Sequence, residues 1–274
     1  MVKKLVRNKM FIISFIMLFP VVTLALFGSV LAPQDPLKID SMNVLQSSSS
    51  QHFLGTDEYG RDILSRLMLG IRPTILVAIG STAISLVAGV LIGVLAGYAR
   101  GLVEKVIMRT IDIFLCFPPI LLALIIVGFW GSGVRNLILI IGLIYTPYFA
   151  RIAYSATIQV KGLEFVQSER SLGASHFRII QKAILPNIMS PLIIQVSLTF
   201  AAAILLESGL SFLGLGIIPP EPSWGQMIGE ARGYLYVYPM YVIWPALCLG
   251  ITMLAVNLMG DSLRDVLDPK LKTK

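Results

Sequence analysis

The side chains that could perform bond chemistry are few in this sequence, and they lie far apart. Two histidines, His52 and His176, are isolated, and two cysteines, Cys116 and Cys248, both lie inside apolar runs. This spacing offers no metal-ligand set, and the cysteines are expected to be small core hydrophobes. No stretch matches the G-x-x-x-x-G-K-[ST] loop that binds nucleotide phosphates. We therefore expect no catalytic residue, no metal and no cofactor on this chain.

The composition indicates a membrane protein. Hydrophobic residues make up 56% of the 274 residues, charged residues make up 14%, and the mean hydropathy is +0.82. Soluble domains are usually about 45–50% apolar and about 25% charged. The net charge of +7 could suggest nucleic-acid binding, but the basic residues lie in short loops between apolar runs. We interpret the excess as a sign of membrane topology.

Six apolar runs approach the roughly 20 residues that a membrane-spanning helix needs. The first run could be a signal peptide, but it exceeds the usual length of such a core, so we expect a retained span. The fourth run is short, so its helix should continue past Arg151, which would lie in the last turn and reach the interface. The sequence thus predicts an all-α integral membrane protein with six transmembrane helices, and the runs are residues 10–31, 74–98, 113–134, 136–150, 188–218 and 234–260.

Basic residues orient these spans, because cytoplasmic loops are enriched in Lys and Arg. With the N-terminus inside, 16 of the 22 Lys and Arg residues fall in inside segments and six fall outside. We therefore expect both termini in the cytoplasm. The six outside are Lys38, Arg61, Arg66, Arg72, Arg135 and Arg232.

The longest segment predicted outside, residues 32–73, divides into two parts. Its first part, which contains Ser47–Ser50, is expected to be a loop. Its second part, residues 57–70, is predicted to form an interfacial helix with Asp57 as N-cap. The apolar face of that helix would comprise Ile63, Leu64, Leu67 and Met68.

Polar and aromatic residues near this segment have two interpretations. Asp57, Glu58, Arg61 and Asp62 form a dense charged cluster, which is either a solvated, salt-bridged helix face or a docking surface. Trp224 lies in a proline-rich outer loop, PPEPSWGQM, and is expected to anchor that loop at the membrane interface.

The stretch SERSLGASHFRIIQKAILPN, Ser168–Asn187, predicts a polar hairpin between the fourth and fifth spans. Gly173 can adopt the left-handed conformation that ends one helix, and Ser175 can cap the next. Pro186 is expected to stop the second helix. The predicted apolar face comprises Phe177, Ile180 and Ile184, opposite Arg178, Gln181 and Lys182. Such a helix could rest on the inner leaflet or fit a groove on a soluble partner, and both alternatives stay open.

Two acids and three glycines lie at or within the predicted spans. Asp112 is expected to pair with Arg109, three residues away. Glu207 could make a structural hydrogen bond, hold a gate or contact the substrate, because an unpartnered acid in the membrane is unfavourable. The spacing of Gly89, Gly93 and Gly97 permits close helix packing.

Several co-linear motifs resemble the dipeptide/oligopeptide/nickel branch of ABC-importer permeases. They are HFLGTDEYGRDILSRL (52–67), SFLGLGIIPPEPSWGQMI (211–228) and GDSLRDVLDPKL (260–271), and the spacing of Gly173, Leu185 and Pro186 resembles the family's cytoplasmic "EAA" loop. Where that loop usually has Glu-Ala-Ala, this chain has Gln-Ser-Glu, and Ala183 replaces a usual isoleucine. The resemblance implies a type I importer fold in which the hairpin docks on a cytoplasmic ATPase. The implied coupling residues are Gln167, Ser168, Glu169, Gly173, Ala174, Phe177, Arg178, Ile180, Leu185 and Pro186.

The same resemblance implies partners, location and organisation. It implies a second, homologous permease, two ATPases that use the ATP, and an extracytoplasmic solute-binding protein, all at a prokaryotic plasma membrane. Residues 1–72 would form the first span and outer segment, 73–262 the permease domain with a coupling loop at about 161–187, and 263–274 a cytoplasmic tail. The candidate docking residues for the binding protein are Asp57, Glu58, Arg61, Asp62 and Trp224.

Three other functions are alternatives to import of di- or oligopeptides. Import of nickel or a metal chelate is the nearest, since a chelated metal needs no protein ligand. An ion-coupled secondary transporter should show inverted repeats and a paired acid deep in the membrane, and neither pattern is evident. An intramembrane protease needs a nucleophile–base pair, but His52 and His176 lie outside the predicted spans.

Overall fold

The computed structural model describes residues 8–99 and 101–267, and it describes side chains only up to residue 265. Those ranges contain helices, turns and loops, without a β-strand. Several basic residues used for the topology prediction, at positions 3, 4, 7, 100, 270, 272 and 274, lie outside the described residues, as does the end of the last motif. The helices are α2 (Lys9–Leu31), α3 (Ile63–Tyr98), α4 (Leu102–Leu115), α5 (Pro119–Trp130), α6 (Val134–Lys161), α7 (Glu164–Ser171), α8 (His176–Ile179), η1 (Ile180–Ile184), α9 (Leu185–Phe212), α10 (Trp224–Ala231), η2 (Arg232–Tyr234) and α11 (Pro239–Leu267).

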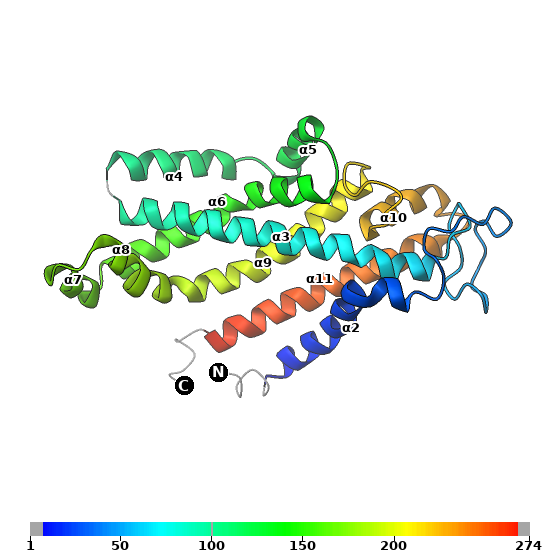
Figure 1. Ribbon diagram of the computed structural model, residues 1–274, viewed down its shortest axis with the longest axis horizontal. Coiled ribbons are helices and arrows are strands. Elements are labelled where there is room, and N and C mark those ends of the chain that lie inside the picture. Colours follow the sequence, from blue (N-terminus) through cyan, green and yellow to red (C-terminus); the bar gives the residue numbers. More distant parts are fainter. Residues whose placement is uncertain (1–7, 100, 268–274) are drawn as a thin grey trace.

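The long helices run along the long axis of the molecule, with short elements at both ends (Figure 1). The α7–α8 hairpin lies at one end, and the 32–62 segment lies with α10 at the other. The first residues of α2 and the last described residues of α11 point toward the hairpin end. The hairpin and these two helix ends therefore share a side.

The tightest helix pair is α3 with α6, and its packing depends on glycines. A Cβ atom on Gly89 would lie 2.7 Å from the Thr146 carbonyl oxygen, and one on Gly93 would overlap the Ala150 carbonyl oxygen. A Cβ on Gly97 would lie 2.8 Å from Cβ of Thr157. The predicted close packing is confirmed, because only glycine lets the two backbones approach this closely.

The predicted number of spans is confirmed when one bent pair is taken as a single span. Five helices of the described part are long and apolar enough to cross a membrane: α2, α3, α6, α11 and the continuous run His176–Phe212. The sixth span is the pair α4 and α5, which meet at 92°. The predicted span at 113–134 was therefore wrong in its bounds, since it took α4 for a loop. Pro118 and Pro119 cause the break, because a proline cannot donate the helical hydrogen bond.

The predicted interfacial helix over residues 57–70 is not a separate element. Helix α3 begins at Ile63 and continues through the span to Tyr98. Its N-cap is Asp62, whose Oδ2 accepts a 2.8 Å hydrogen bond from the amide of Ser65. Asp57 instead closes a turn, because its Oδ1 accepts hydrogen bonds from the amides of Tyr59 and Arg61.

Helix α6 continues past Arg151, as expected, but Arg151 does not lie in its last turn. The helix runs on to Lys161, and the Arg151 guanidinium pairs with Asp112 of α4 at 2.8 Å. The predicted pairing of Asp112 with Arg109 is therefore wrong. Sequence spacing favoured the neighbour on the same helix, whereas the packing of α4 beside α6 supplies a different cation.

The last two spans are shifted along the chain relative to their predicted bounds. Helix α9 starts at Leu185 and ends at Phe212, before a turn in which Gly214 has a φ of +78°. Helix α11 starts at Pro239, because residues 232–238 form a 3₁₀ turn and a loop. Each apolar run thus extends past one end of its helix, because the residues of the adjoining turn are also apolar.

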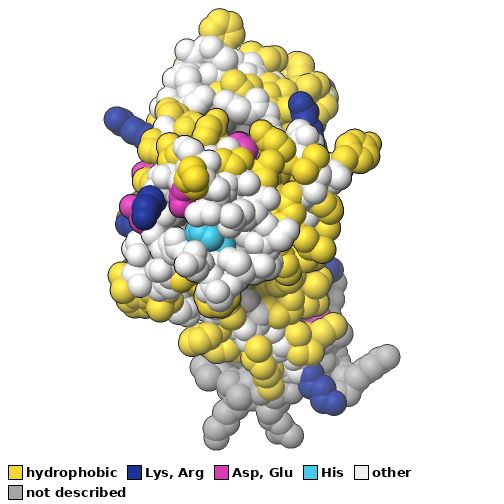
Figure 2. Space-filling model, turned by 90° about the vertical axis from the view of Figure 1, so that its right-hand side faces the viewer, with side chains coloured by type: hydrophobic (Ala, Val, Ile, Leu, Met, Phe, Trp, Pro, Cys, Tyr) yellow, Lys and Arg dark blue, Asp and Glu magenta, His cyan; other side chains and the backbone are white. Residues whose placement is uncertain are grey.

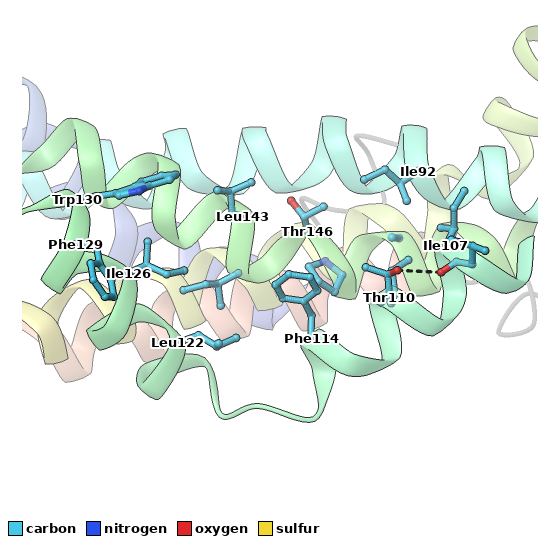
Figure 3. Close-up of a pocket in the computed structure, with 15 residues that line it drawn as sticks. Ile92, Ile107, Thr110, Phe114, Leu122, Ile126, Phe129, Trp130, Leu143 and Thr146 are labelled. Carbon is cyan, nitrogen blue, oxygen red and sulfur yellow. Dashed lines mark hydrogen bonds between the residues drawn. The ribbon is translucent and has the colours of Figure 1, made fainter. Parts of the chain in front are cut away.

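A cavity of about 740 Å³ lies between α3, α4, α5 and α6 (Figure 3). Its lining is apolar except for two threonines, and both hydroxyls donate to their own helix: Thr110 to the Val106 carbonyl at 3.0 Å and Thr146 to that of Gly142 at 2.8 Å. The walls offer no charged group to a ligand. This cavity is suited to hydrocarbon, and we do not place the functional site there.

Candidate functional site

The hairpin, residues 164–179, consists of α7, a glycine turn and α8. Gly173 has a φ of +80°, the left-handed conformation that its position predicts. The Ser175 side chain accepts a hydrogen bond from the amide of Arg178 at 3.4 Å, which caps α8. Both features turn the chain sharply between two short helices, so the hairpin has a defined shape.

Pro186 does not end the second helix, contrary to prediction. A π-helical turn, η1, joins α8 directly to α9, and Pro186 lies in the first turn of α9. The amide of Leu185 bonds to the Ile180 carbonyl, five residues back. Proline has no backbone N–H to donate. It is tolerated here because the wider π turn does not need that hydrogen bond. The hairpin is therefore joined rigidly to the fifth span.

The apolar face of the hairpin differs from the predicted one. Ile184 is buried, but Ile180 is only half-buried and Phe177 is 74% exposed. The packed face consists of Ile179, Ala183 and Ile184, which join the core around Phe149. The prediction failed because the π turn changes the angular spacing of the residues that follow Phe177.

The opposite surface of the hairpin presents apolar side chains to the outside. Leu172 is 87% exposed and Phe177 is 74% exposed, on either side of the Gly173 turn. An open hollow of about 640 Å³ on the α7 side is lined by Gln167, Ser168 and Leu172 among others. One carboxylate oxygen of Glu169, also in α7, is buried and lacks a hydrogen-bond partner within the described part of the chain.

The charged cluster at the other end of the molecule is buried rather than solvated. Asp57 is fully buried, and its Oδ2 lies 2.6 Å from Nε of Arg61 and 3.3 Å from Nε of Arg66. Arg66 also contacts Glu230 of α10 at 3.1 Å, and Arg61 contacts Glu58 at 3.7 Å. Both interpretations from sequence placed these side chains on the surface. They lie inside because α10 folds over the start of α3.

Arg66 and Glu230 also belong to this cluster, although the sequence pattern did not predict them. The signal for Arg66 was its place between the apolar residues Ile63 and Leu67 on the buried face of α3. Glu230 comes from α10, which is distant in the sequence, and no local pattern pointed to it. Desolvation raises the pKa of Glu230 above its ordinary value of 4.5, although Arg66 opposes the shift. The cluster therefore holds an acid whose charge is unfavourable in its surroundings.

Two more residues of the predicted docking set have internal partners. Asp62 is 2% exposed and contacts Nδ1 of His52 at 3.0 Å. Trp224 is also 2% exposed, and its Nε1 donates to the Leu67 carbonyl at 2.9 Å. The expectation that Trp224 anchors the loop at the membrane interface is wrong. It instead attaches α10 to α3, because the apolar ring is covered by the core around Ile63.

The surface at this end carries exposed hydrophobic side chains, and Figure 2 looks onto it. Met42 is 90% exposed, Ile39 is 63% exposed and Phe53 is 59% exposed, all in the 32–62 segment. Tyr236, in the loop before α11, is 98% exposed. Isolated exposed apolar residues are common, but several at one end indicate a surface that meets another molecule or the bilayer.

Glu207 is fully buried in α9 and is surrounded by hydroxyl groups. Ser211 donates to its Oε1 at 2.6 Å, and Ser208 donates to its Oε2 at 3.3 Å. Thr74 of α3 and Ser223 at the start of α10 lie close to it. The carboxyl group thus lies where three elements meet and presents no surface to a ligand.

Sequence comparison places this architecture in a known class. Residues 89–273 match the family model described as "Binding-protein-dependent transport system inner membrane component", and residues 1–47 match the "N-terminal TM domain of oligopeptide transport permease C". The chain belongs to the family of binding-protein-dependent transport system inner membrane components. It is therefore a multi-pass inner membrane protein and a permease subunit of an ABC importer, a transport component rather than an enzyme.

Individual relatives are similar over nearly the whole chain. The di/tripeptide transport system permease protein DppC of Pseudomonas aeruginosa is 41% identical, over 92% of this chain and 85% of that protein. The glutathione transport system permease protein GsiD of Pectobacterium atrosepticum is 36% identical, over 99% of this chain and 90% of that protein. The dipeptide transport system permease protein DppC of Alkalihalophilus pseudofirmus is 36% identical, over 99% and 89%.

A solved structure shares the fold. It is an inward-facing conformation of the MetNI methionine ABC transporter, with a TM-score of 0.61 over 74% of this chain and 96% of that one. The sequence identity is 20%, so this likeness concerns the fold alone. The expected type I permease fold is confirmed.

Proposed function

We propose that this chain forms half of the translocation pathway of an ATP-driven importer for di- or oligopeptides. The names of its relatives support this cargo class, since they describe transport of dipeptides, di/tripeptides and glutathione. Its partners are a homologous second permease, two cytoplasmic ATPases and an extracytoplasmic binding protein. The ATPases use the ATP, because the sequence of this chain has no phosphate-binding loop.

The exposed apolar tip of the hairpin carries this proposal. Leu172 and Phe177 project from a structure that is anchored on its other face by Ile179 and Ile184. Large apolar side chains held outside the bilayer by a rigid turn favour a protein partner. We assign the tip to a cleft of the ATPase.

This assignment orients the chain with the hairpin in the cytoplasm. The excess of basic residues in the inside segments supports the orientation, and both described helix ends, of α2 and α11, share the hairpin side. The 32–62 segment then faces outward. We infer that it receives the binding protein through exposed residues such as Ile39, Met42 and Phe53, while the buried cluster around Asp57 supports that surface from within.

We assign Glu207 a structural role at the outer end of the pathway. Its carboxyl group is fully buried where α9 meets α3 and the start of α10. A group in this position can hold the outer elements together, but a cargo cannot reach it without their rearrangement.

Recovery of the ATPase with a tip variant tests the docking assignment. Phe177→Asp places a carboxylate where an apolar ring should be buried. Burial of such a ring contributes about 1.5–3 kcal/mol, so recovery of the ATPase on purified permease should fall by roughly 10-fold or more. The variant should still insert and fold, since the native side chain has few internal contacts.

Leu102→Asp is the matched control, because Leu102 is 79% exposed at the start of α4, at the same end of the molecule. It should leave ATPase recovery unchanged. Equal recovery for Phe177→Asp and wild type would show that the tip does not contact the ATPase.

A further inference from the structure

The hairpin is connected to the end of α3 by a contact between two distant residues. The hydroxyl of Tyr98, at the last position of α3, lies 2.7 Å from Nδ1 of His176, the first residue of α8. The two rings also meet edge to face, with centroids 5.5 Å apart and planes at 72°. This geometry fixes both the distance and the relative angle of the two elements.

Lys161, the last residue of α6, completes the cluster. Its ammonium lies 5.1 Å from the centre of the Tyr98 ring and donates to the carbonyls of Gly97 and Tyr98. Terminal carbonyls of a helix attract a cation, so Lys161 closes the end of α3. The Gln167 side chain donates to the Lys161 carbonyl at 3.1 Å, which extends the contacts to α7.

The helices behind this cluster leave little space for independent movement. Next to Tyr98, Gly97 packs so closely on α6 that a Cβ atom would lie 2.9 Å from the Tyr154 carbonyl oxygen. The core around Ile179 and Ile184 already holds the base of the hairpin. Without the contact between Tyr98 and His176, the base would stay in place, but the α7–α8 tip could tilt against α3.

We propose that Tyr98 and His176 are positioning residues that transmit movement of the hairpin tip to the α3–α6 pair. This inference rests on the proposed function, since it requires the tip to be moved by an ATPase. The bond is not needed for assembly, because Leu172 and Phe177, which form the docking tip, are exposed and take no part in the contact with Tyr98. Loss of the bond should therefore change the coupling of ATP hydrolysis to transport, without loss of the complex.

The test uses the complete transporter in proteoliposomes, with binding protein and cargo outside and ATP inside. Tyr98→Phe removes only the hydroxyl and should leave ATPase recovery as in wild type. The amount of cargo imported per ATP hydrolysed should fall roughly threefold or more, within the range by which positioning residues alter coupling between sites. His176→Leu should reproduce this loss, and the double variant should be no worse than either single variant, because both remove one bond.

Two further variants separate positioning from general stability. His176→Gln supplies a side-chain amide that can bond to the Tyr98 hydroxyl. This variant should recover most of the cargo imported per ATP hydrolysed. Tyr154→Phe is the matched control: the Tyr154 hydroxyl donates to Glu104 at 2.6 Å, and so joins α6 to α4 without touching the hairpin. Tyr154→Phe should import as much cargo per ATP hydrolysed as the wild type does.

A wild-type ratio in Tyr98→Phe would overturn the proposal, and so would parallel losses of assembly and transport, which indicate a purely structural bond. An equal loss in Tyr154→Phe would also overturn it. These results differ from a failure of the proposed function, in which the wild-type complex itself would not import cargo with ATP.

Discussion

Gly173 is the residue on which the shape of the hairpin depends. Its φ is +80°, and no atom lies within 4 Å of the position that a Cβ would occupy. A substitution there is strained by the backbone conformation alone, without a steric clash. The strain should be roughly 1–2 kcal/mol for most side chains, and less for asparagine, which tolerates this conformation.

Gly173→Val should therefore deform the hairpin while the membrane part still folds. Recovery of the ATPase on the purified permease should fall about 5-fold or more, whereas Gly173→Asn should recover most of it. Gly162→Ala is the control, because Gly162 has an ordinary φ of −79° in the same loop. Normal recovery with valine at position 173 would mean that the turn does not shape the docking surface.

Glu230 gives the outer cluster a pH dependence. Desolvation raises its pKa above 4.5, so the folded protein holds the proton more tightly than the unfolded chain does. Its contribution to stability is therefore lost as the pH rises from about 4.5 through the raised pKa. Thermal unfolding of the purified protein should show this decline, and Glu230→Gln should flatten it. An identical pH profile for Glu230→Gln would show that Glu230 does not cause the decline in stability.

At the residue scale, the sequence predicted backbone conformation better than side-chain surroundings. The left-handed Gly173 and the Ser175 cap follow from local chemistry, and both are present in the structure. The burial of Asp57 and Trp224 could not be predicted, because it depends on contacts between α10 and the start of α3, which lie more than 150 positions apart in the chain. Charge patterns within a short stretch do not reveal such distant partners.

At the element scale, the α3–α6 pair is the rigid centre of the molecule. Gly93 is the closest point of contact, since a Cβ there would overlap the Ala150 carbonyl oxygen and crowd the Ala153 side chain. Neither backbone can move aside without loss of other contacts along the pair. Changes at this position should therefore affect folding rather than docking.

Gly93→Ala should destabilise the protein by about 1–3 kcal/mol, the usual range for overpacking, and larger side chains should prevent folding. The midpoint of thermal unfolding in detergent measures this loss. Gly128→Ala, in helix α5, is the control, because no atom lies within 4 Å of its Cβ position. A variant at position 93 as stable as the control would contradict the close packing.

Helix number could be predicted from hydropathy, but helix ends could not. The prediction merged or displaced elements wherever a turn lay inside an apolar run, as at Pro118 and at Gly214. It also divided α3, because the charged residues near Arg61 suggested a surface helix. Those charges are neutralised within the fold, and this compensation is visible only in three dimensions.

At the scale of the whole molecule, orientation in the membrane decides which end meets which partner. Ser50, in the 32–62 segment, and Ser171, in the hairpin, are both exposed. In a background without Cys116 and Cys248, Ser50→Cys should react with an impermeant thiol reagent in intact cells, and Ser171→Cys should react only after permeabilisation. The reverse pattern would place the hairpin outside the cell, where it could not contact a cytoplasmic ATPase.

The central claim is that this chain transports only as part of an ATP-driven complex. Uptake of a labelled dipeptide into proteoliposomes tests it most directly, with the chain alone compared with the chain plus its second permease, ATPases and binding protein. The complete complex should import only with ATP inside and binding protein outside, and the chain alone should import nothing under a proton or sodium gradient. Gradient-driven uptake by this chain alone would contradict the claim.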